Sequence, residues 1–315
     1  VDLRWRRASG GMVTLHGSSV PVLSRSGRLL GWRGCWRAVD DDGLTRRRLA
    51  GIVHRVKELV EQPDLGIHLQ PIVDLGSPRL LGAEALARFR DARSPTEWFA
   101  DAHEAGVGVD LELLALRTEL EVLNEPHVLP PGTYLSVNVS PVVLMDPDFV
   151  ALLRSGPLAL DRLVLEITEH AAVQAYDEIS ALLLPFRERG LRLAVDDTGA
   201  GYASFNHVLR LRPDIIKLDR SLLHDIDSDP ARRAFVTAIV LMALELDAAV
   251  TAEGVERPEQ LETLRTLGVD SVQGYLIARP SADPAAWRRW ARRDWAATLP
   301  QSSPVTLTAP ASAAT

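Results

Sequence analysis

The sequence contains one cysteine, Cys35, and no hydrophobic run long enough to span a membrane. A single cysteine excludes disulfide bonds within the chain and favours a protein of the reducing cytoplasm. The longest apolar run, residues 235–244, is interrupted by Thr237 and is far shorter than the roughly 20 residues that a membrane-spanning helix needs. We therefore expect a soluble, cytoplasmic protein without a membrane segment.

A positive net charge and an N-terminal leader are also missing. The formal net charge of −7 argues against binding to a polymeric nucleic acid. The chain begins Val1-Asp2-Leu3, without Met or an apolar signal region, which predicts a fragment of a longer protein. Hydrophobic residues, by contrast, make up 46% of the 315 residues, which is enough for a large folded core.

Residues 1–43 have the pattern of β-strands. Two alternating segments, 12–23 and 28–39, are joined by the turn Ser24-Arg25-Ser26-Gly27. The strings Ser19-Val20-Pro21-Val22 and 27–34 resemble the last strands of PAS sensory domains, and this resemblance implies the C-terminal remnant of such a domain. A hairpin from an unrelated β domain is the alternative interpretation.

Residues 44–62 predict a linker helix. Its apolar residues fall at helical spacing, at Leu49, Ile52, Val53, Val56, Leu59 and Val60. Because this stripe has no evident partner in the sequence, we expect it to contact the same helix of a second chain. The protein would then be a homodimer that associates through this helix and through the domain that follows.

From residue 63, strand-like segments alternate with amphipathic helices, which is typical of α/β proteins with a parallel sheet. Residues 63–297 approach the roughly 250 residues of a (β/α)₈ barrel, so we predict a TIM-type barrel. Its last helix, 284–297, should pack its tryptophans inward, and residues 298–315 should form a disordered tail. The eight strand-like segments are Gly66–Val73, Leu80–Phe89, Tyr134–Val139, Leu163–Ile167, Leu191–Val195, Asp214–Leu218, Ala248–Ala252 and Ser271–Ile277.

Polar side chains occur in or just after most of these apolar segments. They are Glu84, Asn138, Glu166, Asp196, Asp197, Lys217, Glu253 and Gln273. Such groups are costly to bury unless they pair with one another or bind a metal ion. Oxygen ligands without His or Cys favour Mg²⁺, Mn²⁺ or Ca²⁺. Two such ions about 3.5–4 Å apart can hold the attacking and leaving oxygens of a phosphodiester displacement.

Lys217 lies among these acids and has two interpretations. It is either a salt-bridge partner or the group that orients an attacking water.

The motifs around these residues resemble those of the EAL domain family of bacterial cyclic di-GMP phosphodiesterases. The likeness covers about residues 63 to 280 and follows the family's order. It is carried by Gln70-Pro71-Ile72-Val73, Glu84-Ala85-Leu86-Ala87-Arg88, Ser136-Val137-Asn138, Leu165-Glu166-Ile167-Thr168-Glu169, Asp196-Asp197, Lys217-Leu218-Asp219, Ala252-Glu253-Gly254-Val255-Glu256 and Gln273-Gly274-Tyr275.

This resemblance implies an EAL-type barrel that hydrolyses cyclic di-GMP to linear pGpG with two Mg²⁺ or Mn²⁺ ions, regulated by the N-terminal sensory segment. Catalytic roles fall on Lys217, Glu253 and Asp197, and substrate contacts on Gln70, Arg88 and Gln273. The implied metal ligands are Glu84, Asn138, Glu166, Asp196 and Asp197, with Asp196 as the bridge. Two acids, Glu169 and Glu256, are implied to support the site.

One loop departs from the family pattern. Members commonly read Asp-Asp-Phe-Gly-Thr-Gly, whereas this chain has Thr198 in place of Phe and Ala200 in place of Thr. We expect polar contacts, with Glu169 as an acceptor, to hold this loop. Two rival functions remain open at this point: a catalytically silent cyclic di-GMP receptor, and a signalling relay that only binds partner proteins.

Overall fold

The computed structural model describes residues 2–6, 12–23, 29–39, 42–91, 93–125, 128–154, 159–167, 176–198 and 203–299. The chain divides into two compact units. The first comprises residues 1–62 and 96–108, and the second comprises residues 63–95 and 109–315. The predicted tail therefore lies outside the described residues from position 300 onward, as do Glu169 and Ala200.

The first unit begins with a three-stranded antiparallel sheet in the order β1-β2-β3. Its strands are β1 (Asp2–Arg6), β2 (Met12–Leu23) and β3 (Leu29–Val39). The register runs from the pair Thr14 and Val39 to the pair Leu23 and Leu29, which confirms the hairpin expected from the alternating sequence. Its origin in a PAS domain stays a prediction.

Two helices complete the first unit, α1 (Asp42–Glu61) and α2 (Pro95–Glu104). Ile52 and Val56, in the middle of the apolar stripe of α1, are only 1% and 0% exposed in the single chain. The Arg48 guanidinium contacts the carboxylates of Asp101, at 3.0 Å, and Glu104. The middle of the stripe is thus already buried within the chain, and its contact with a second chain stays a prediction.

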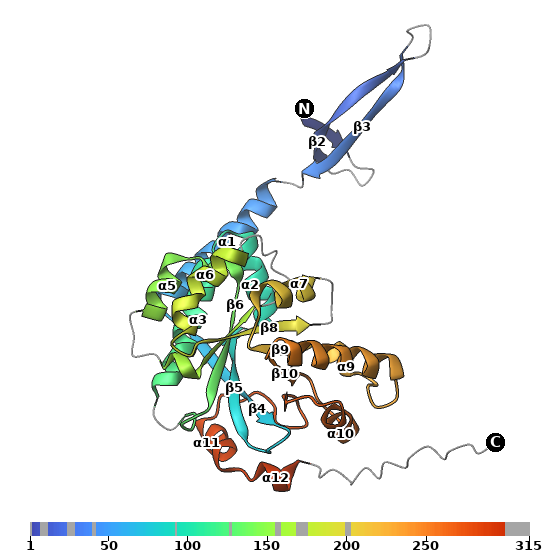
Figure 1. Cartoon of the computed structure of the whole chain (residues 1–315). Helices are drawn as coiled ribbons and strands as arrows, with labels where there is room; N and C mark the ends of the chain where they lie inside the picture. Colours follow the sequence, from blue (N-terminus) through green and yellow to red (C-terminus); the bar gives the residue numbers. More distant parts are fainter. Residues whose placement is uncertain are drawn as a thin grey trace, which may run out of the picture. The chain divides into compact units, whose positions relative to one another are not determined.

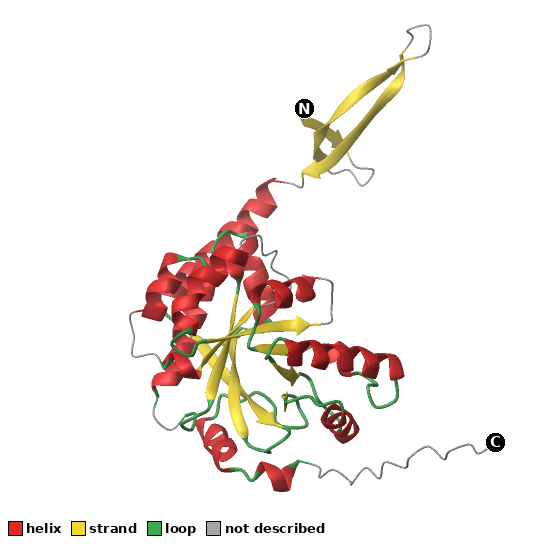
Figure 2. Cartoon of the chain, in the orientation of Figure 1, coloured by secondary structure: helices red, strands yellow, loops and turns green. Residues whose placement is uncertain are grey.

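The second unit is a closed eight-stranded barrel in the order β10-β11-β4-β5-β6-β7-β8-β9, surrounded by helices (Figures 1 and 2). This confirms the predicted TIM-type α/β architecture. The strands are β4 (Leu65–Asp74), β5 (Leu80–Phe89), β6 (Tyr134–Val139), β7 (Leu163–Ile167), β8 (Arg192–Thr198), β9 (Ile215–Leu218), β10 (Ala249–Ala252) and β11 (Ser271–Val272).

Strand β4 departs from the expected parallel arrangement, because it runs antiparallel to both of its neighbours. Only residues 75–79 separate β4 from β5, and a parallel pair needs a crossover of about a dozen residues or more. The chain therefore turns back as a hairpin, in which the Asp74 carboxylate accepts hydrogen bonds from the backbone N–H groups of Gly76 and Ser77.

Most helices of the second unit match the amphipathic segments in the sequence. Trp287, Trp290 and Trp295 are buried, as predicted for the last helical segment, which breaks into two helices between Arg292 and Trp295. Within the described residues, no helix is both long and apolar enough to cross a bilayer. The helices are α3 (Gly108–Asn124), α4 (Pro141–Leu144), α5 (Pro147–Arg154), α6 (Tyr176–Arg187), α7 (Ala203–Leu211), α8 (Arg220–Leu223), α9 (Pro230–Glu245), α10 (Pro258–Thr266), α11 (Pro284–Arg292), α12 (Trp295–Thr298) and the 3₁₀ helix η1 (Leu160–Arg162).

Candidate active site

A buried lysine lies at the centre of the polar cluster inside the barrel. Lys217, on β9, is 1% exposed. Its Nζ lies 2.6 Å from Glu166 Oε2 and 3.4 Å from Asp196 Oδ1. The same atom also contacts Glu253 and lies 3.9 Å from Glu84 Oε1. One cation is thus surrounded by carboxylates from three strands and from the segment that follows β10.

Alternation along the strands explains this convergence. On β9, Ile216 and Leu218 join the main hydrophobic core, whereas Lys217 between them points to the opposite face. On β7, Glu166 is likewise flanked by Leu165 and Ile167, which belong to that core. Because β5 to β10 run parallel, their inward polar side chains gather in one layer near the C-terminal mouth, where barrel enzymes keep their catalytic groups.

Hydroxyl and amide groups orient the carboxylates. Ser136 Oγ, on β6, donates a hydrogen bond to Glu166 Oε1 at 2.5 Å, and Lys217 donates to the other oxygen of Glu166. Two residues further along β6, and so on the same face, Asn138 Nδ2 donates to Glu84 Oε1 at 3.0 Å. The predicted amide Asn138 and the acid Glu84 are therefore direct partners.

Two glutamines occupy the side of the cluster next to β4. Gln273 Nε2 donates to Glu84 Oε2 at 2.6 Å and to Gln70 Oε1 at 2.9 Å. Gln70 Nε2 in turn donates to the carbonyl oxygen of Ala278 at 2.9 Å. The antiparallel register places Gln70 directly opposite Glu84, so the hairpin of β4 and β5 brings this group into the site.

The acid pair Asp196-Asp197 lies in a bulge near the end of β8. The ladder pairs Val195 with Ile216 and then Thr198 with Leu218, so two residues of β8 face one residue of β9. Asp197 has a φ of 52°, a strained value for a residue with a side chain. The strand was expected to stop before these acids. It continues through them instead, and of the two carboxylates that of Asp196 lies in the cluster, 3.4 Å from Lys217 Nζ.

Burial and like charge shift the pKa values of the acids. Burial, only partly opposed by Lys217, raises the pKa of Glu166 to about 8. Burial likewise raises the pKa of Glu253 well above its usual value. Burial alone would lower the pKa of Lys217, but the attraction of Asp196 and Glu166 outweighs it, so that pKa lies well above its ordinary value. The lysine therefore stays charged, and its one positive charge cannot neutralise all of the carboxylates around it.

The donor set fits a hard divalent cation by its chemistry. Four carboxylates and an amide supply oxygen ligands. Among the described residues, the buried Gln273 Oε1 has no hydrogen-bond partner, and Asp196 Oδ1 and Glu253 Oε1 lie against the Lys217 ammonium. Among the residues that the structure describes, no three His, Cys, Asp or Glu side chains are arranged as a metal site. Lys217 accounts for this difference, because its ammonium contacts the oxygens that a cation would need.

Other predicted site residues are not part of this contact network. Arg88, at the end of β5, donates to the carbonyl oxygen of its neighbour Ala87 at 2.8 Å. Glu256 is exposed, and within the described part of the chain its side chain does not contact the cluster. Thr198 is 0% exposed, and its Oγ1 has no hydrogen-bond partner in the described part of the chain. Its predicted neighbour Glu169 lies outside the described residues, so the polar-loop hypothesis stays a prediction.

Sequence reasoning gave no role to two residues near the cluster. Ser136 holds one oxygen of Glu166, and its place two residues before Asn138 on a strand was the available signal. Glu119, on α3, is 4% exposed. Burial, followed by repulsion from Glu84 and Glu166, raises its pKa well above the usual value. Glu119 lies at helical spacing from the buried Leu116 and Leu123, and this position on the apolar face could have indicated its burial.

Comparison with known proteins shows that the residues of the cluster lie in a stretch of sequence shared with a known family. A family model described as EAL domain matches residues 53–280. A cyclic di-GMP phosphodiesterase of Pseudomonas aeruginosa is 32% identical over 238 residues, which cover 72% of this chain and 40% of that protein. The phosphodiesterase NbdA of the same organism is 34% identical over 236 residues, 71% of this chain and 30% of that protein. The chain spans less than half the length of these relatives.

Solved structures show the same barrel. The complex of Klebsiella pneumoniae BlrP1 with calcium and cyclic di-GMP aligns with a TM-score of 0.61 and 33% identity, covering 70% of this chain and 57% of that chain. A manganese complex of that protein aligns with a TM-score of 0.61 and 30% identity, covering 70% of this chain and 56% of that chain.

Proposed function

Because this chain belongs to the EAL domain family, we propose that it hydrolyses cyclic di-GMP to linear pGpG. The observation that carries the proposal is the buried cluster in which Lys217 meets Glu84, Glu166, Asp196 and Glu253 at one mouth of the barrel. In the reaction, a water oxygen bonds to phosphorus, the bond from phosphorus to the 3′-oxygen breaks, and the leaving oxygen takes a proton. The product gains a terminal phosphomonoester that the cyclic substrate lacks.

We assign the metal ligands within this cluster. Glu84, Asn138, Glu166 and Asp196 would hold a first divalent cation, with Asp196 bridging to a second beside Asp197 and Glu253. When bound, the two cations would lower the pKa of the attacking water and neutralise charge on the phosphodiester. We propose that both ions are Mg²⁺ or Mn²⁺. The similarity to one protein solved with calcium and with manganese supports a divalent ion.

Lys217 is assigned to the nucleophile. Its ammonium lies next to Glu253 and 3.4 Å from Asp196, where it can donate a hydrogen bond to a water and hold it beside the phosphate. Gln70, Arg88 and Gln273 lie around the same strands and are proposed to contact the substrate. Arg88 suits this role because its guanidinium has only a backbone carbonyl as its recorded partner. The acids Glu169 and Glu256 are proposed to support the site.

Regulation by the N-terminal segment and assembly into a homodimer also belong to the proposal. The second unit has an apolar surface that suits such an assembly. Phe205 on α7 packs edge-on against Phe235 on α9, with ring centroids 6.0 Å apart, so the two helices are neighbours. Leu209 on α7 and Leu241 on α9 are 59% and 58% exposed. Light scattering on the protein and on Leu241→Glu tests the dimer, which should dissociate in the variant.

The proposed activity has a direct test. The protein is incubated with cyclic di-GMP and Mn²⁺ or Mg²⁺, with and without EDTA, and the products are separated by chromatography. We expect pGpG to form only with metal. Binding of cyclic di-GMP without turnover would identify a receptor, and an isothermal titration that detects no binding would identify a signalling relay. Either result rejects the proposed hydrolase.

A further inference from the structure

The opposite mouth of the barrel contains a cavity of about 560 Å³, which we call the N-terminal cavity. Its walls come from the first residues of several strands, among them Tyr134 of β6, Arg192 of β8 and Ile215 of β9. The turn after β4 adds Arg79. The cavity lies entirely within the second unit, and its volume is typical of sites for small molecules.

The aspartates of this cavity are engaged by the backbone. Asp214 Oδ2 accepts a hydrogen bond from Leu193 N at 2.7 Å, and Asp270 Oδ2 accepts one from Val250 N at 2.7 Å. Asp74 accepts the two turn N–H groups already described. These carboxylates fix the ends of strands, so their presence does not indicate a cation site.

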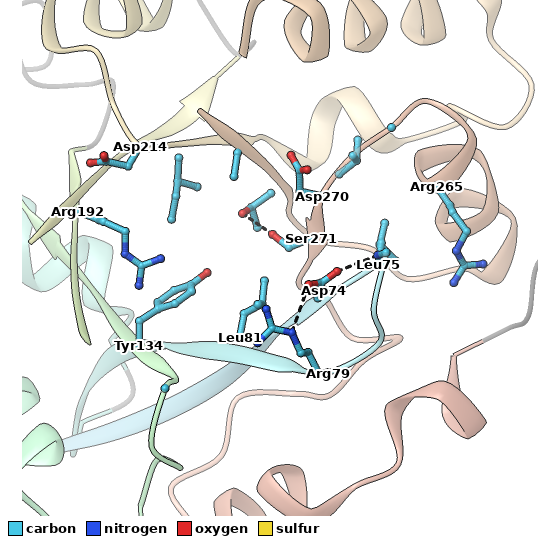
Figure 3. Close-up of a pocket in the computed structure, with 17 residues that line it drawn as sticks. Asp74, Leu75, Arg79, Leu81, Tyr134, Arg192, Asp214, Arg265, Asp270 and Ser271 are labelled. Carbon is cyan, nitrogen blue, oxygen red and sulfur yellow. Dashed lines mark hydrogen bonds and ion pairs between the residues drawn. The ribbon is translucent and has the colours of Figure 1, made fainter. Parts of the chain in front are cut away.

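Two arginines of the cavity, Arg192 and Arg79, are engaged much less, whereas Arg265 pairs with Glu262 at 3.0 Å. The guanidinium of Arg192 stacks on the ring of Tyr134, with its Cζ 4.5 Å from the ring centroid. No hydrogen bond or ion pair of this guanidinium is recorded among the described residues, although the residue is partly buried. Arg79, 64% exposed, lies 3.6 Å from Asp74. Figure 3 shows Arg192 and Tyr134 on one side of the cavity, with their polar ends toward its open middle, and Arg79 on another side.

This arrangement suits an oxyanion. Stacking fixes the plane of the Arg192 guanidinium and leaves its N–H donors free at the edge, where they match two oxygens of a phosphate. The Tyr134 hydroxyl, which also points into the cavity, adds a donor from the same side. Arg79 lies on a second wall, with its Nε 3.6 Å from Asp74 Oδ2, so donors are present on more than one side of the cavity. A tetrahedral group offers oxygens in several directions, whereas a carboxylate offers them in one plane.

We propose that the N-terminal cavity binds a small phosphomonoester, with Arg192 and Tyr134 holding the phosphate and Arg79 closing on it from the rim. This site is separate from the Lys217 cluster and does not depend on hydrolytic activity.

Isothermal titration with glucose 6-phosphate, in EDTA, tests the site. Inorganic phosphate, succinate and glucose serve as comparison ligands. We expect binding of glucose 6-phosphate, a weaker response to succinate and none to glucose. Arg192→Gln should raise the Kd roughly tenfold or more, because hydrogen bonds to a charged group are lost. Arg189→Gln, an exposed arginine just before β8, is the matched control and should leave the Kd unchanged.

Two further variants keep the test decisive if Arg192→Gln is poorly folded. Arg192→Lys retains the charge without the fork of donors and should still weaken binding. Arg79→Gln, at the exposed rim, should weaken it less. The proposal fails if glucose 6-phosphate does not bind, if the Arg192 and Arg79 variants bind it as tightly as the natural protein, or if Arg189→Gln weakens it equally. Succinate binding as tightly as glucose 6-phosphate would overturn the assignment to a phosphomonoester.

Discussion

The two mouths of the barrel differ in the partners of their acidic and basic side chains. At the C-terminal mouth, the carboxylates of Glu84, Glu166, Asp196 and Glu253 all lie around the single ammonium of Lys217. At the N-terminal mouth, carboxylates such as Asp214 and Asp270 are satisfied by backbone N–H groups, while the Arg192 guanidinium has an aromatic face as its recorded contact. Excess negative charge favours cations at one end, and a guanidinium without an ion pair among the described residues favours anions at the other.

The largest effect is expected from removing the shared cation. Lys217→Ala leaves several buried carboxylates without their partner, and breaking a buried pair this way costs roughly 3–5 kcal/mol of unfolding free energy. Hydrolysis should fall by orders of magnitude, while cyclic di-GMP still binds in the presence of metal. Urea unfolding and product chromatography measure the two effects. The sequence's other lysine, the exposed Lys57, gives the control Lys57→Ala. An active Lys217→Ala protein would contradict the role assigned to this lysine.

A smaller structural effect, with a similar loss of activity, is expected at Glu84. Glu84→Gln removes one negative charge but keeps a side chain of the same shape, whose single carbonyl oxygen can still accept a hydrogen bond from Asn138 or Gln273. Metal-dependent hydrolysis should drop about 100-fold or more, and stability without metal should stay the same or rise, because repulsion among the acids is relieved. Calorimetry with Mn²⁺ should show weaker metal binding. Unchanged turnover would remove Glu84 from the metal ligands.

The pKa of Glu166 predicts a pH dependence of stability. This carboxyl has a pKa of about 8 in the folded protein, against 4.5 as its ordinary value, so the folded state holds a proton that the unfolded state releases. Between these two values, stability without metal should therefore fall as pH rises. Glu166→Gln should flatten that dependence, and Glu178→Gln, an exposed acid on α6, should not. Urea unfolding in EDTA at several pH values measures it. The raised pKa of Glu166 would be contradicted if stability changed with pH in the same way in the natural protein, Glu166→Gln and Glu178→Gln.

The smallest effects compare one threonine from each mouth. Thr198 is buried with an unpartnered Oγ1, whereas Thr251 Oγ1 lies 2.7 Å from Ser271 Oγ in a buried hydrogen bond. Thr198→Val should leave stability unchanged or slightly higher, and Thr251→Val should lower it by about 1–2 kcal/mol. Thr198→Phe would overpack this buried position and cost roughly 1–3 kcal/mol. Thermal unfolding distinguishes these cases. A large loss of stability in Thr198→Val would show that the Thr198 hydroxyl has a hydrogen-bond partner.

Features with a regular period could be predicted from the sequence. The barrel followed from alternating strands and amphipathic helices, and the inward position of Lys217 between Ile216 and Leu218 followed from the same period. The antiparallel β4 depends on the short connection at 75–79, which indicates a hairpin once its length is considered. Contacts between elements distant in the sequence were harder to predict. The bulge at Asp196 and Asp197 and the burial of Ile52 depend on tertiary packing that has no local signature.

The central claim is that the Lys217 cluster positions the water that attacks the phosphodiester of cyclic di-GMP, and that its carboxylates would hold the divalent cations that activate this water. Hydrolysis in ¹⁸O-labelled water with Mn²⁺, followed by mass spectrometry, tests it most directly. We predict that pGpG forms with one heavy oxygen in its new terminal phosphate, and that neither EDTA-treated protein nor Glu84→Gln forms appreciable product. Labelled product at the same rate in EDTA, or intact cyclic di-GMP in every sample, would contradict this assignment.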